Sequence, residues 1–317
     1  MSATYLFTRI DGGLLGLLVG DALGVPVEFS SREQRLADPV TDLRAFGTHN
    51  QPAGTWSDDG SLALCTASSL IEAGYDLEDT ARRFVRWLDE AYWTPHGKVF
   101  DIGYTTRRAI QRLRKGTPPT EAGGQREQDN GNGSLMRILP LALRFPNLPV
   151  PELLDRAHGL SCLTHAHPRA QLACGFYTVL ATRLLAGEMA TDAYHAAIEI
   201  TRPVYSQPPF ADEREHFDRV LGGQIAAVSP DDIRGSGYVV HSLEASLWCL
   251  LRHDSYAAAV LAAVNLGEDT DTTGAVTGGL AGIVYGESGI PAQWIQSLAR
   301  LEEVRRLAAQ MNVAQMS

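Results

Sequence analysis

Glycine recurs at every fourth position in two apolar segments of the chain, one near each end. The eight positions are Gly12, Gly16, Gly20, Gly24, Gly274, Gly278, Gly282 and Gly286. Residues four apart lie on one face of a helix, so each segment predicts a helix with a groove that another backbone can approach closely. Glycine inside a helix costs up to about 1 kcal/mol relative to alanine, which indicates a packing role. We expect the two helices to cross each other in the core, with separate crossings of other helices as the alternative.

Apolar residues elsewhere in the chain recur with helical spacing, and strand signals are scarce. Further helices are predicted over 62–73, 77–92, 104–114, 151–161, 170–185, 191–201, 216–228, 241–251, 255–264, 291–301 and 302–311. No linker, charge run or low-complexity tract marks a boundary. The prediction is therefore an all-α, compact single-domain orthogonal helical bundle over residues 1–317.

Charge and cysteine content exclude several classes of protein. The formal net charge of -10 disfavours a nucleic-acid partner. The N-terminus lacks a cleavable signal, and we expect no stretch with the roughly 20 apolar residues that a membrane span needs. Four cysteines lie far apart among apolar neighbours and are expected to be reduced core thiols, which predicts a cytoplasmic protein. They are Cys65, Cys162, Cys174 and Cys249.

Two short clusters combine carboxylates with a hydroxyl directly before a predicted helix. Such hard oxygen ligands suit magnesium, manganese or calcium rather than zinc. Helix capping alone would explain only some of these residues. If the clusters converge, they form a cage for two metal ions. Their members are Ser57, Asp58 and Asp59 in the first, and Asp269, Asp271 and Thr272 in the second.

Glu28 follows the first glycine-rich helix, which is expected to end near Gly24 and Pro26. If the two glycine-rich helices cross antiparallel, the end of the first lies beside the start of the second. This crossing would bring Glu28 near Asp269 and Asp271. Without it, Glu28 would be a solvated carboxylate after a turn.

Three loops and one helix start are candidates for substrate contacts. The loop at 131–134 exposes backbone amides of the kind that bind phosphate, although a set of tight turns has the same composition. Asp101 either caps the following helix or contacts substrate, and Tyr238 either stacks on a sugar or base or packs in the core. The spacing around His165 does not suit zinc. The candidate contacts are Asp101, Tyr104, Gly131, Asn132, Gly133, Ser134, Met136, His165, Ser236, Gly237 and Tyr238.

Taken in order, these motifs resemble those of the ADP-ribosylglycohydrolases, especially the bacterial dinitrogenase-reductase-activating branch. Ser57 stands where the family often has threonine, and Glu268 stands where it often has glycine. Tyr104 replaces the asparagine expected in the nitrogenase-regulating branch, which argues against that role. The matching motifs are Gly20-Asp21-x-x-Gly24-x-x-x-Glu28, Trp56-Ser57-Asp58-Asp59, Asp101-Ile-Gly103, Gly131-Asn132-Gly133-x-x-Met136-Arg137, Thr164-His165-x-His167 and Asp269-x-Asp271-Thr272.

The resemblance implies an all-α domain with two magnesium or manganese ions at the bottom of a cleft. It implies that the loop at 131–134 holds a pyrophosphate, that Asp101 and His165 approach the ribose or the leaving group, and that Tyr238 is an aromatic contact. The implied metal ligands are Ser57, Asp58, Asp59, Asp269, Asp271 and Thr272.

The resulting hypothesis is hydrolysis of the glycosidic bond to the terminal ribose in an ADP-ribosylated protein or a small ADP-ribose conjugate. Glu28, or a metal-binding aspartate such as Asp58 or Asp269, would be the general base. ADP-ribosyl-arginine is favoured because the nearest resemblance is to the dinitrogenase-reductase-activating branch and because Asp101 can pair with a guanidinium. Serine-linked or O-acyl-ADP-ribose are the alternatives. A phosphoester or pyrophosphate hydrolase would instead release AMP, and an inactive ADP-ribose-binding protein would release nothing.

Overall fold

The computed structural model describes residues 3–313, and side chains for residues 6–312. Within these residues the chain is helical and has no strand beyond isolated bridges. The α-helices are α1 (Ala3–Gly24), α2 (Arg32–Ala37), α3 (Asp58–Glu72), α4 (Leu77–Glu90), α5 (Tyr104–Arg114), α6 (Pro119–Ala122), α7 (Leu139–Arg144), α8 (Val150–Cys162), α9 (Pro168–Leu185), α10 (Ala190–Tyr205), α11 (Asp218–Leu221), α12 (Val239–Arg252), α13 (Tyr256–Val264), α14 (Thr270–Tyr285), α15 (Ala292–Ser297) and α16 (Leu301–Val313). Short 3-10 helices are η1 (Val25–Val27), η2 (Gly47–His49), η3 (Glu127–Asp129), η4 (Leu135–Arg137), η5 (Ala211–Phe217), η6 (Ile225–Ala227), η7 (Pro230–Asp232) and η8 (Glu287–Gly289).

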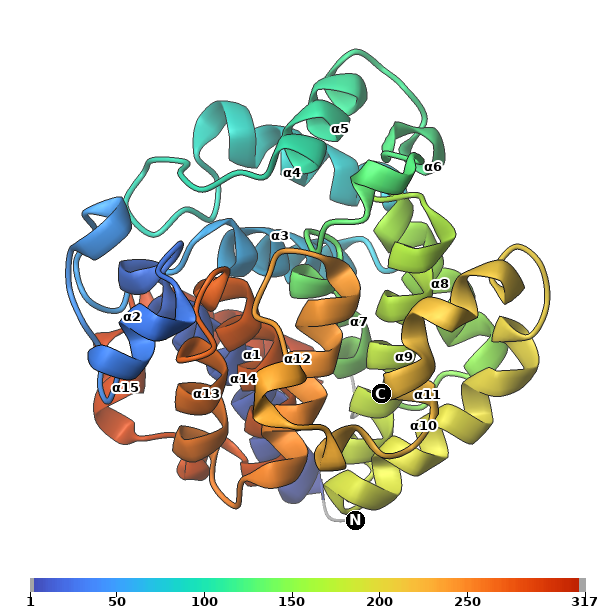
Figure 1. Cartoon of the computed structure of the whole chain (residues 1–317). Helices are drawn as coiled ribbons and strands as arrows, with labels where there is room; N and C mark the ends of the chain where they lie inside the picture. Colours follow the sequence, from blue (N-terminus) through green and yellow to red (C-terminus); the bar gives the residue numbers. More distant parts are fainter. Residues whose placement is uncertain (1–2, 314–317) are drawn as a thin grey trace.

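Helices α1 and α14 pack against each other in the interior, with the remaining helices around them (Figure 1). A Cβ atom added to Gly16 would lie 2.4 Å from the carbonyl oxygen of Gly278, and one added to Gly20 would lie 2.1 Å from that of Gly274. Both distances are shorter than any real side chain tolerates, so only glycine fits. The antiparallel crossing predicted from the glycine pattern is confirmed, and we call this contact the glycine seam.

The far end of the seam differs from the sequence prediction by one residue. Helix α14 stops at Tyr285, and Gly286 follows it with a φ of 69°. Because this left-handed conformation favours glycine, Gly286 ends the helix instead of extending its ridge.

Helix α1 corrects the expectation that no segment is long and apolar enough to span a membrane. The stretch Leu6–Val27 has a mean hydropathy of 1.5 and passes that test by length and composition. The structure buries 94% of its most apolar window inside the protein. The apolar character of α1 is therefore that of a core helix, whose partners are other helices of the same chain.

A continuous apolar core joins α1 to most of the other helices, from Ile10 near the N-terminus to Met311 in α16. Trp56, just before α3, and Phe176 of α9 are among the largest fully buried side chains, and the ring of Phe176 packs edge-on against Tyr194 of α10. All four cysteines are free, as expected, and only Cys162 is partly exposed. A shared core of this kind favours the single-domain organisation, which stays a prediction.

The predicted helix over 216–228 is wrong. The chain forms only one short helix there, α11 (Asp218–Leu221), between the 3-10 helices η5 and η6. Gly222 and Gly223 follow α11 directly, and Gly223 has a φ of 76°. The apolar spacing in this segment is compatible with a helix, but the glycine pair stops it after one turn.

Candidate metal centre and active site

Asp21 of α1 fixes the start of α3. Its carboxylate accepts hydrogen bonds from the backbone N–H of Ser57, at 2.9 and 3.0 Å, and from that of Gly60, at 2.8 Å. Burial raises the pKa of Asp21 to about 7, against the opposing effect of these hydrogen bonds. The hydroxyl of Ser57 also accepts the backbone N–H of Asp59 as the cap of α3. Asp21 thereby ties the first acidic cluster to the glycine seam.

The second acidic cluster begins α14 and meets the first. The hydroxyl of Thr272 lies 3.3 Å from the carboxylate of Asp59, so the two clusters are in hydrogen-bond contact. The amide of Asn132 donates to the Asp269 carboxylate at 2.9 Å. The backbone N–H of Thr272 donates to the carboxylate of Asp271 at 2.9 Å. Residues more than 200 positions apart in the chain are thus brought into one polar cluster.

Glu28, directly after η1, completes this cluster. One oxygen each of Glu28, Asp269 and Asp271 lies within 4.8 Å of the others. The segments that carry them are also joined through the backbone, because Phe29 donates its N–H to the carbonyl of Glu268 at 2.7 Å. The expectation that the antiparallel crossing brings Glu28 beside the two aspartates is confirmed.

His49 is a site residue that the sequence did not indicate. Its Nε2 atom is hydrogen-bonded to the Glu28 carboxylate and lies 3.8 Å from Asp101 Oδ1. The preceding Thr48 donates its hydroxyl to the backbone carbonyl of Glu28 at 2.8 Å. Both residues lie in the short helix η2, whose first residue, Gly47, leaves no room for a Cβ against the backbone of η1. The η2 turn therefore holds Glu28 by both its side chain and its backbone.

The carboxylates of the site are buried close together. Burial, and then the charges of neighbouring carboxylates, raise the pKa of Asp58, Asp59 and Asp271 well above the usual range. Asp59 Oδ1 and Asp271 Oδ2 have no contact with solvent and accept no hydrogen bond from the described residues. Buried carboxylate oxygens that accept no hydrogen bond need either a proton or a cation. The chemistry of this donor set fits hard divalent cations.

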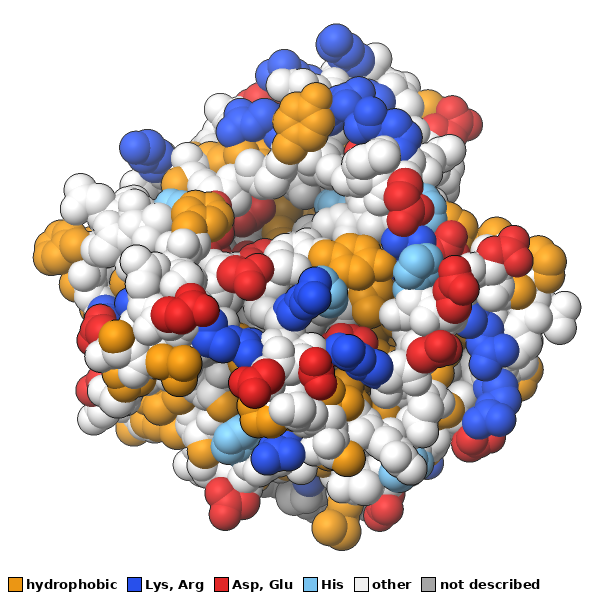
Figure 2. Space-filling model, in the orientation of Figure 1, with side chains coloured by type: hydrophobic (Ala, Val, Ile, Leu, Met, Phe, Trp, Pro, Cys, Tyr) orange, Lys and Arg blue, Asp and Glu red, His pale blue; other side chains and the backbone are white. Residues whose placement is uncertain are grey.

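A cavity of about 450 Å³ opens onto the acidic cluster. Figure 2 shows a hollow in the upper half of this face with acidic side chains inside it. Most residues expected at the site line this cavity. They are Glu28, Asp58, Asp101, Tyr104, Gly131, Asn132, Gly133, Met136, His165, Gly237, Asp269 and Thr272.

Three residues predicted to contact substrate do not line this cavity. Ser134 is fully buried, and its hydroxyl accepts hydrogen bonds from inside the core. The hydroxyl of Tyr238 accepts a hydrogen bond from Arg169 at 3.0 Å. Ser236 is hydrogen-bonded to the ring of His241 at 2.7 Å. Each polar group has a protein partner that the sequence pattern does not reveal.

The glycine-rich loop lies against a neutral histidine. A Cβ at Gly133 would lie 2.8 Å from the ring of His165, so glycine allows the loop to approach the ring closely. Thr164 contacts the other side of the ring at 2.8 Å. Burial, and then the charge of Arg137, lower the pKa of His165 to about 3. This wall of the cavity therefore remains uncharged at neutral pH.

Comparison with known proteins now identifies the family. The family model described as ADP-ribosylglycohydrolase matches residues 1–317. The chain belongs to this family. It is 32% identical over 308 residues to the ADP-ribosylarginine hydrolase Tri1 of Serratia proteamaculans, covering 96% of this chain and 78% of the relative. It is 30% identical over 322 residues to the ADP-ribosyl-[dinitrogen reductase] glycohydrolase of Rhodospirillum rubrum, covering 96% of each.

A solved structure extends the comparison to the fold. The structure described as "ADP-ribosylglycohydrolase-related protein complex" matches with a TM-score of 0.83 and 35% sequence identity. The match covers 99% of this chain and 100% of that chain. The family predicted from the motifs and the all-α class predicted from the helical spacing are both confirmed.

Proposed function

We propose that this glycohydrolase releases ADP-ribose from arginine side chains of proteins, using two divalent cations, magnesium or manganese. The observation that carries the proposal is the convergence of Glu28, Asp269 and Asp271, of which Glu28 and Asp269 line the cavity. The relative in Serratia proteamaculans, an ADP-ribosylarginine hydrolase, supports the arginine linkage.

Six residues would hold the cations in this proposal. The orphaned oxygens of Asp59 and Asp271 support a cation between the two clusters. Such ions supply positive charge that orients sugar hydroxyls and lowers the pKa of water. The proposed ligands are Ser57, Asp58, Asp59, Asp269, Asp271 and Thr272.

Glu28 is the proposed general base. Its side chain is buried, lies beside the cation ligands and lines the cavity. Burial, and then the charges of Asp101 and Asp269, raise its pKa to about 10, so bound cations would be needed for it to accept a proton from an attacking water. The hydrogen bond from His49 holds its carboxylate in one orientation. Asp101 faces the same cavity and lies close enough to the base to pair with the departing guanidinium.

The opposite wall would bind the ADP-ribose moiety. The backbone of Gly131 and Gly133 lines the cavity without side chains in the way, which suits close approach of a pyrophosphate. Neutral His165 adds a hydrogen-bonding group without placing a positive charge beside the proposed cations. These contacts orient the ribose toward the acidic cluster.

The expected partner is an ADP-ribosylated protein or a small ADP-ribose conjugate. We further propose a cytoplasmic location, which the four free cysteines support.

Product analysis by mass spectrometry tests the function. The protein is incubated with Mn²⁺ or Mg²⁺ and with arginine-linked or serine-linked ADP-ribosyl peptides. Intact ADP-ribose from the arginine-linked peptide is expected. Release of ADP-ribose from the serine-linked peptide alone would show that the linkage is to serine and not to arginine. AMP as the product would show a phosphohydrolase and not a glycohydrolase. Absence of any product would contradict both the linkage and the reaction.

An Asp269→Ala variant tests the site, with Asp192→Asn on the exposed surface of α10 as the matched control. The first variant is expected to lose turnover while its helical content stays near that of the parent. The control is expected to keep full activity. Full activity of Asp269→Ala would show that Asp269 is not needed for catalysis and would contradict its proposed role as a metal ligand.

A further inference from the structure

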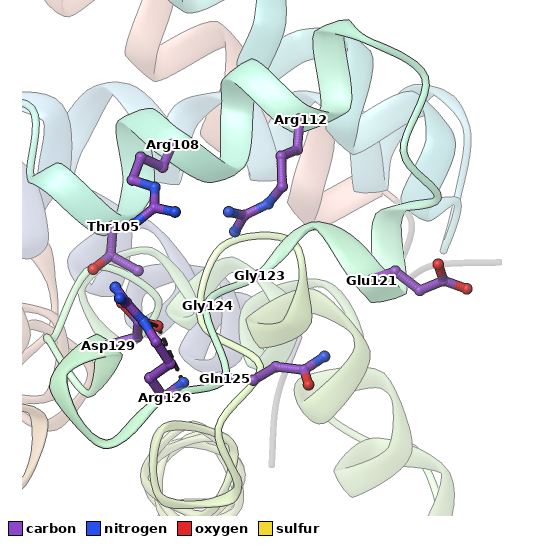
Figure 3. Close-up of a pocket in the computed structure, with 9 residues that line it drawn as sticks. All are labelled: Thr105, Arg108, Arg112, Glu121, Gly123, Gly124, Gln125, Arg126 and Asp129. Atoms are coloured by element: carbon purple, nitrogen blue, oxygen red, sulfur yellow. Dashed lines mark hydrogen bonds and ion pairs between the residues drawn. The ribbon is translucent and has the colours of Figure 1, made fainter.

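A second hollow, of about 330 Å³, lies beside the proposed active site. It is bounded by α5, α6 and the segment that leads to η3 (Figure 3). Thr105 lines both this hollow and the larger cavity, so the two adjoin at the start of α5. None of the motifs that indicate the family points to this hollow.

Two arginines of α5 point into the hollow. Arg108 and Arg112 are four residues apart and so share one face of the helix. Figure 3 shows their guanidinium groups extending toward each other above the Gly123–Gly124 segment. Arg112 donates its Nε–H to the carbonyl of Ala122 at 2.6 Å, which fixes the group and leaves its terminal nitrogens for another partner. We call this site the arginine pocket.

The direct contacts of Arg108 are with an uncharged side chain. Its guanidinium carbon lies 5.3 Å from the centre of the Tyr104 ring, and its Nη1 atom contacts the Tyr104 hydroxyl at 3.4 Å. Neither contact provides a negative charge. Within the described residues, no ion pair joins Arg108 or Arg112 to a carboxylate.

The acidic residues that line the arginine pocket form no ion pair with Arg108 or Arg112 in the described structure. Asp129 is paired with Arg126 at 2.9 Å, and Glu121 points away from the two arginines in Figure 3. Burial, and then the charge of Arg108, lower the pKa of Arg112. The charge of Asp129 opposes this shift but does not outweigh burial and the charge of Arg108. In a chain of net charge -10, this pocket therefore has an excess of positive charge.

We propose that the arginine pocket binds an oxyanion of the modified protein itself, a carboxylate or phosphate group near the residue that carries ADP-ribose. The proposal rests on the proposed function and names a feature of its protein substrate. Paired guanidinium groups bind such anions through charge-assisted and bidentate hydrogen bonds.

The surroundings of the pocket favour a protein-borne anion. Tyr104, at the edge of the active-site cavity, is 70% exposed and lies in contact with Arg108. Figure 2 shows basic side chains gathered at the top of the face, where α5 lies in Figure 1. A protein whose modified side chain enters the cavity would rest on this surface. Acidic groups beside the modified residue are complementary to it.

The test uses arginine-linked ADP-ribosyl peptides that differ only at positions flanking the modified arginine, with glutamate, phosphoserine or glutamine there. For the parent protein, kcat/KM is expected to be about tenfold higher with an acidic peptide than with the glutamine peptide. The difference is expected to come from a lower KM and to become smaller at high salt. The Arg108→Gln/Arg112→Gln variant is expected to lose this preference. Arg114→Gln is the matched control, because Arg114 lies on the same helix but is paired with Asp89 at 3.0 Å.

Free ADP-ribosyl-arginine separates the arginine pocket from the active site. The double variant is expected to hydrolyse it at the parental rate. A loss on this small substrate would mean that the arginines bind ADP-ribose itself, and the proposal would be wrong. Equal rates on acidic and neutral peptides would also overturn it, and the glutamate and phosphoserine peptides together distinguish the two anions.

Binding of unmodified peptides gives an answer that does not depend on turnover. Fluorescently labelled glutamate and phosphoserine peptides are expected to bind the parent more tightly than the double variant, as measured by fluorescence anisotropy. Equal affinities of the parent and the double variant for these peptides would overturn the proposal that the arginine pocket binds the anion, even if no peptide were hydrolysed. Absence of hydrolysis with intact binding would instead contradict the proposed function alone.

Discussion

Helices α1 and α14 have opposite energetic roles at the two ends of their contact. Along the glycine seam the backbones pack directly, which stabilises the folded state through dense contact. At the other end, Asp21, Asp269 and Asp271 are buried close to further carboxylates, which destabilises the folded state unless protons or cations are bound. The comparison indicates that close packing in one half of a helix pair supports an acidic site in the other half.

Adding one methyl group to the seam is expected to have the largest effect. In Gly16→Ala the new Cβ would lie 2.4 Å from the backbone oxygen of Gly278, so a helix must move. We expect a loss of about 3 kcal/mol or more in the free energy of unfolding, measured by urea denaturation. Gly13→Ala is the matched control in α1, because its Cβ would meet only side chains of Ile283 and Leu143 at 3.0 Å. Equal losses for both would show that the seam has no special role.

The acidic end is expected to make metal binding depend on pH. A carboxyl group whose pKa is raised in the folded protein binds its proton at a higher pH in the folded than in the unfolded state. The free energy of unfolding of the metal-free protein therefore increases as the pH falls through the raised pKa. Burial raises the pKa of Asp21 to about 7 and that of Asp59 and Asp271 well above the usual range. Protons then compete with Mn²⁺, whose stabilising effect should shrink by about 1.4 kcal/mol per pH unit for each proton displaced below pH 7.

The measurement is the midpoint temperature of thermal unfolding with and without Mn²⁺, between pH 8 and pH 5 in steps of about one pH unit. Burial lowers the pKa of His158 to about 4, so this histidine destabilises the folded protein as the pH falls below the ordinary histidine value. This effect of His158 is the same with and without Mn²⁺, so it cancels when one curve of midpoint against pH is subtracted from the other. A difference that does not change with pH would contradict the acidic cluster as the binding site.

Removing one charge from the acidic end is expected to stabilise the metal-free protein, the reverse of the seam variant. Asp271→Asn keeps the shape of a side chain whose Oδ2 atom has no hydrogen-bond partner in the described structure. We expect a gain of about 1–2 kcal/mol in the metal-free protein and loss of the stabilisation by Mn²⁺. Asp192→Asn, on the exposed surface, is expected to change neither. A destabilised metal-free variant would mean that the carboxylate is well paired without a cation.

The smallest effect is expected at His49, which contacts the cluster from outside it. His49→Leu removes the hydrogen bond to Glu28 and is expected to lower kcat about tenfold, or about 1.4 kcal/mol, with KM unchanged. His49→Gln keeps a donor and is expected to recover most of the rate, as measured by initial rates on ADP-ribosyl-arginine. Equal rates for the two variants would assign His49 a structural role only.

The sequence predicted the parts of the site that follow local patterns. The glycine seam follows from spacing within two helices, and the acidic clusters are contiguous at helix starts. Once the antiparallel crossing is assumed, the position of Glu28 beside Asp269 also follows. These predictions succeed because one helix pair determines all of them.

The sequence did not predict features that depend on how loops fold back. His49 lies in a short turn whose flanking residues Phe46 and Asn50 have positive φ values, and its partner Glu28 is 21 residues away. No periodic pattern marks such a contact. The inward position of Ser134 depends likewise on neighbouring helices. The contacts of these side chains are decided by tertiary packing.

The glycine seam has a consequence for biosynthesis. Its two halves are far apart in the chain, from Gly12 in α1 to Gly282 in α14. On the ribosome, α1 is made first and has to wait for most of the polypeptide before its partner is translated. The aspartates of α14 arrive with that partner, so a nascent chain acquires the complete acidic cluster only near the end of synthesis. Truncated translation products would lack both the seam and the complete cluster.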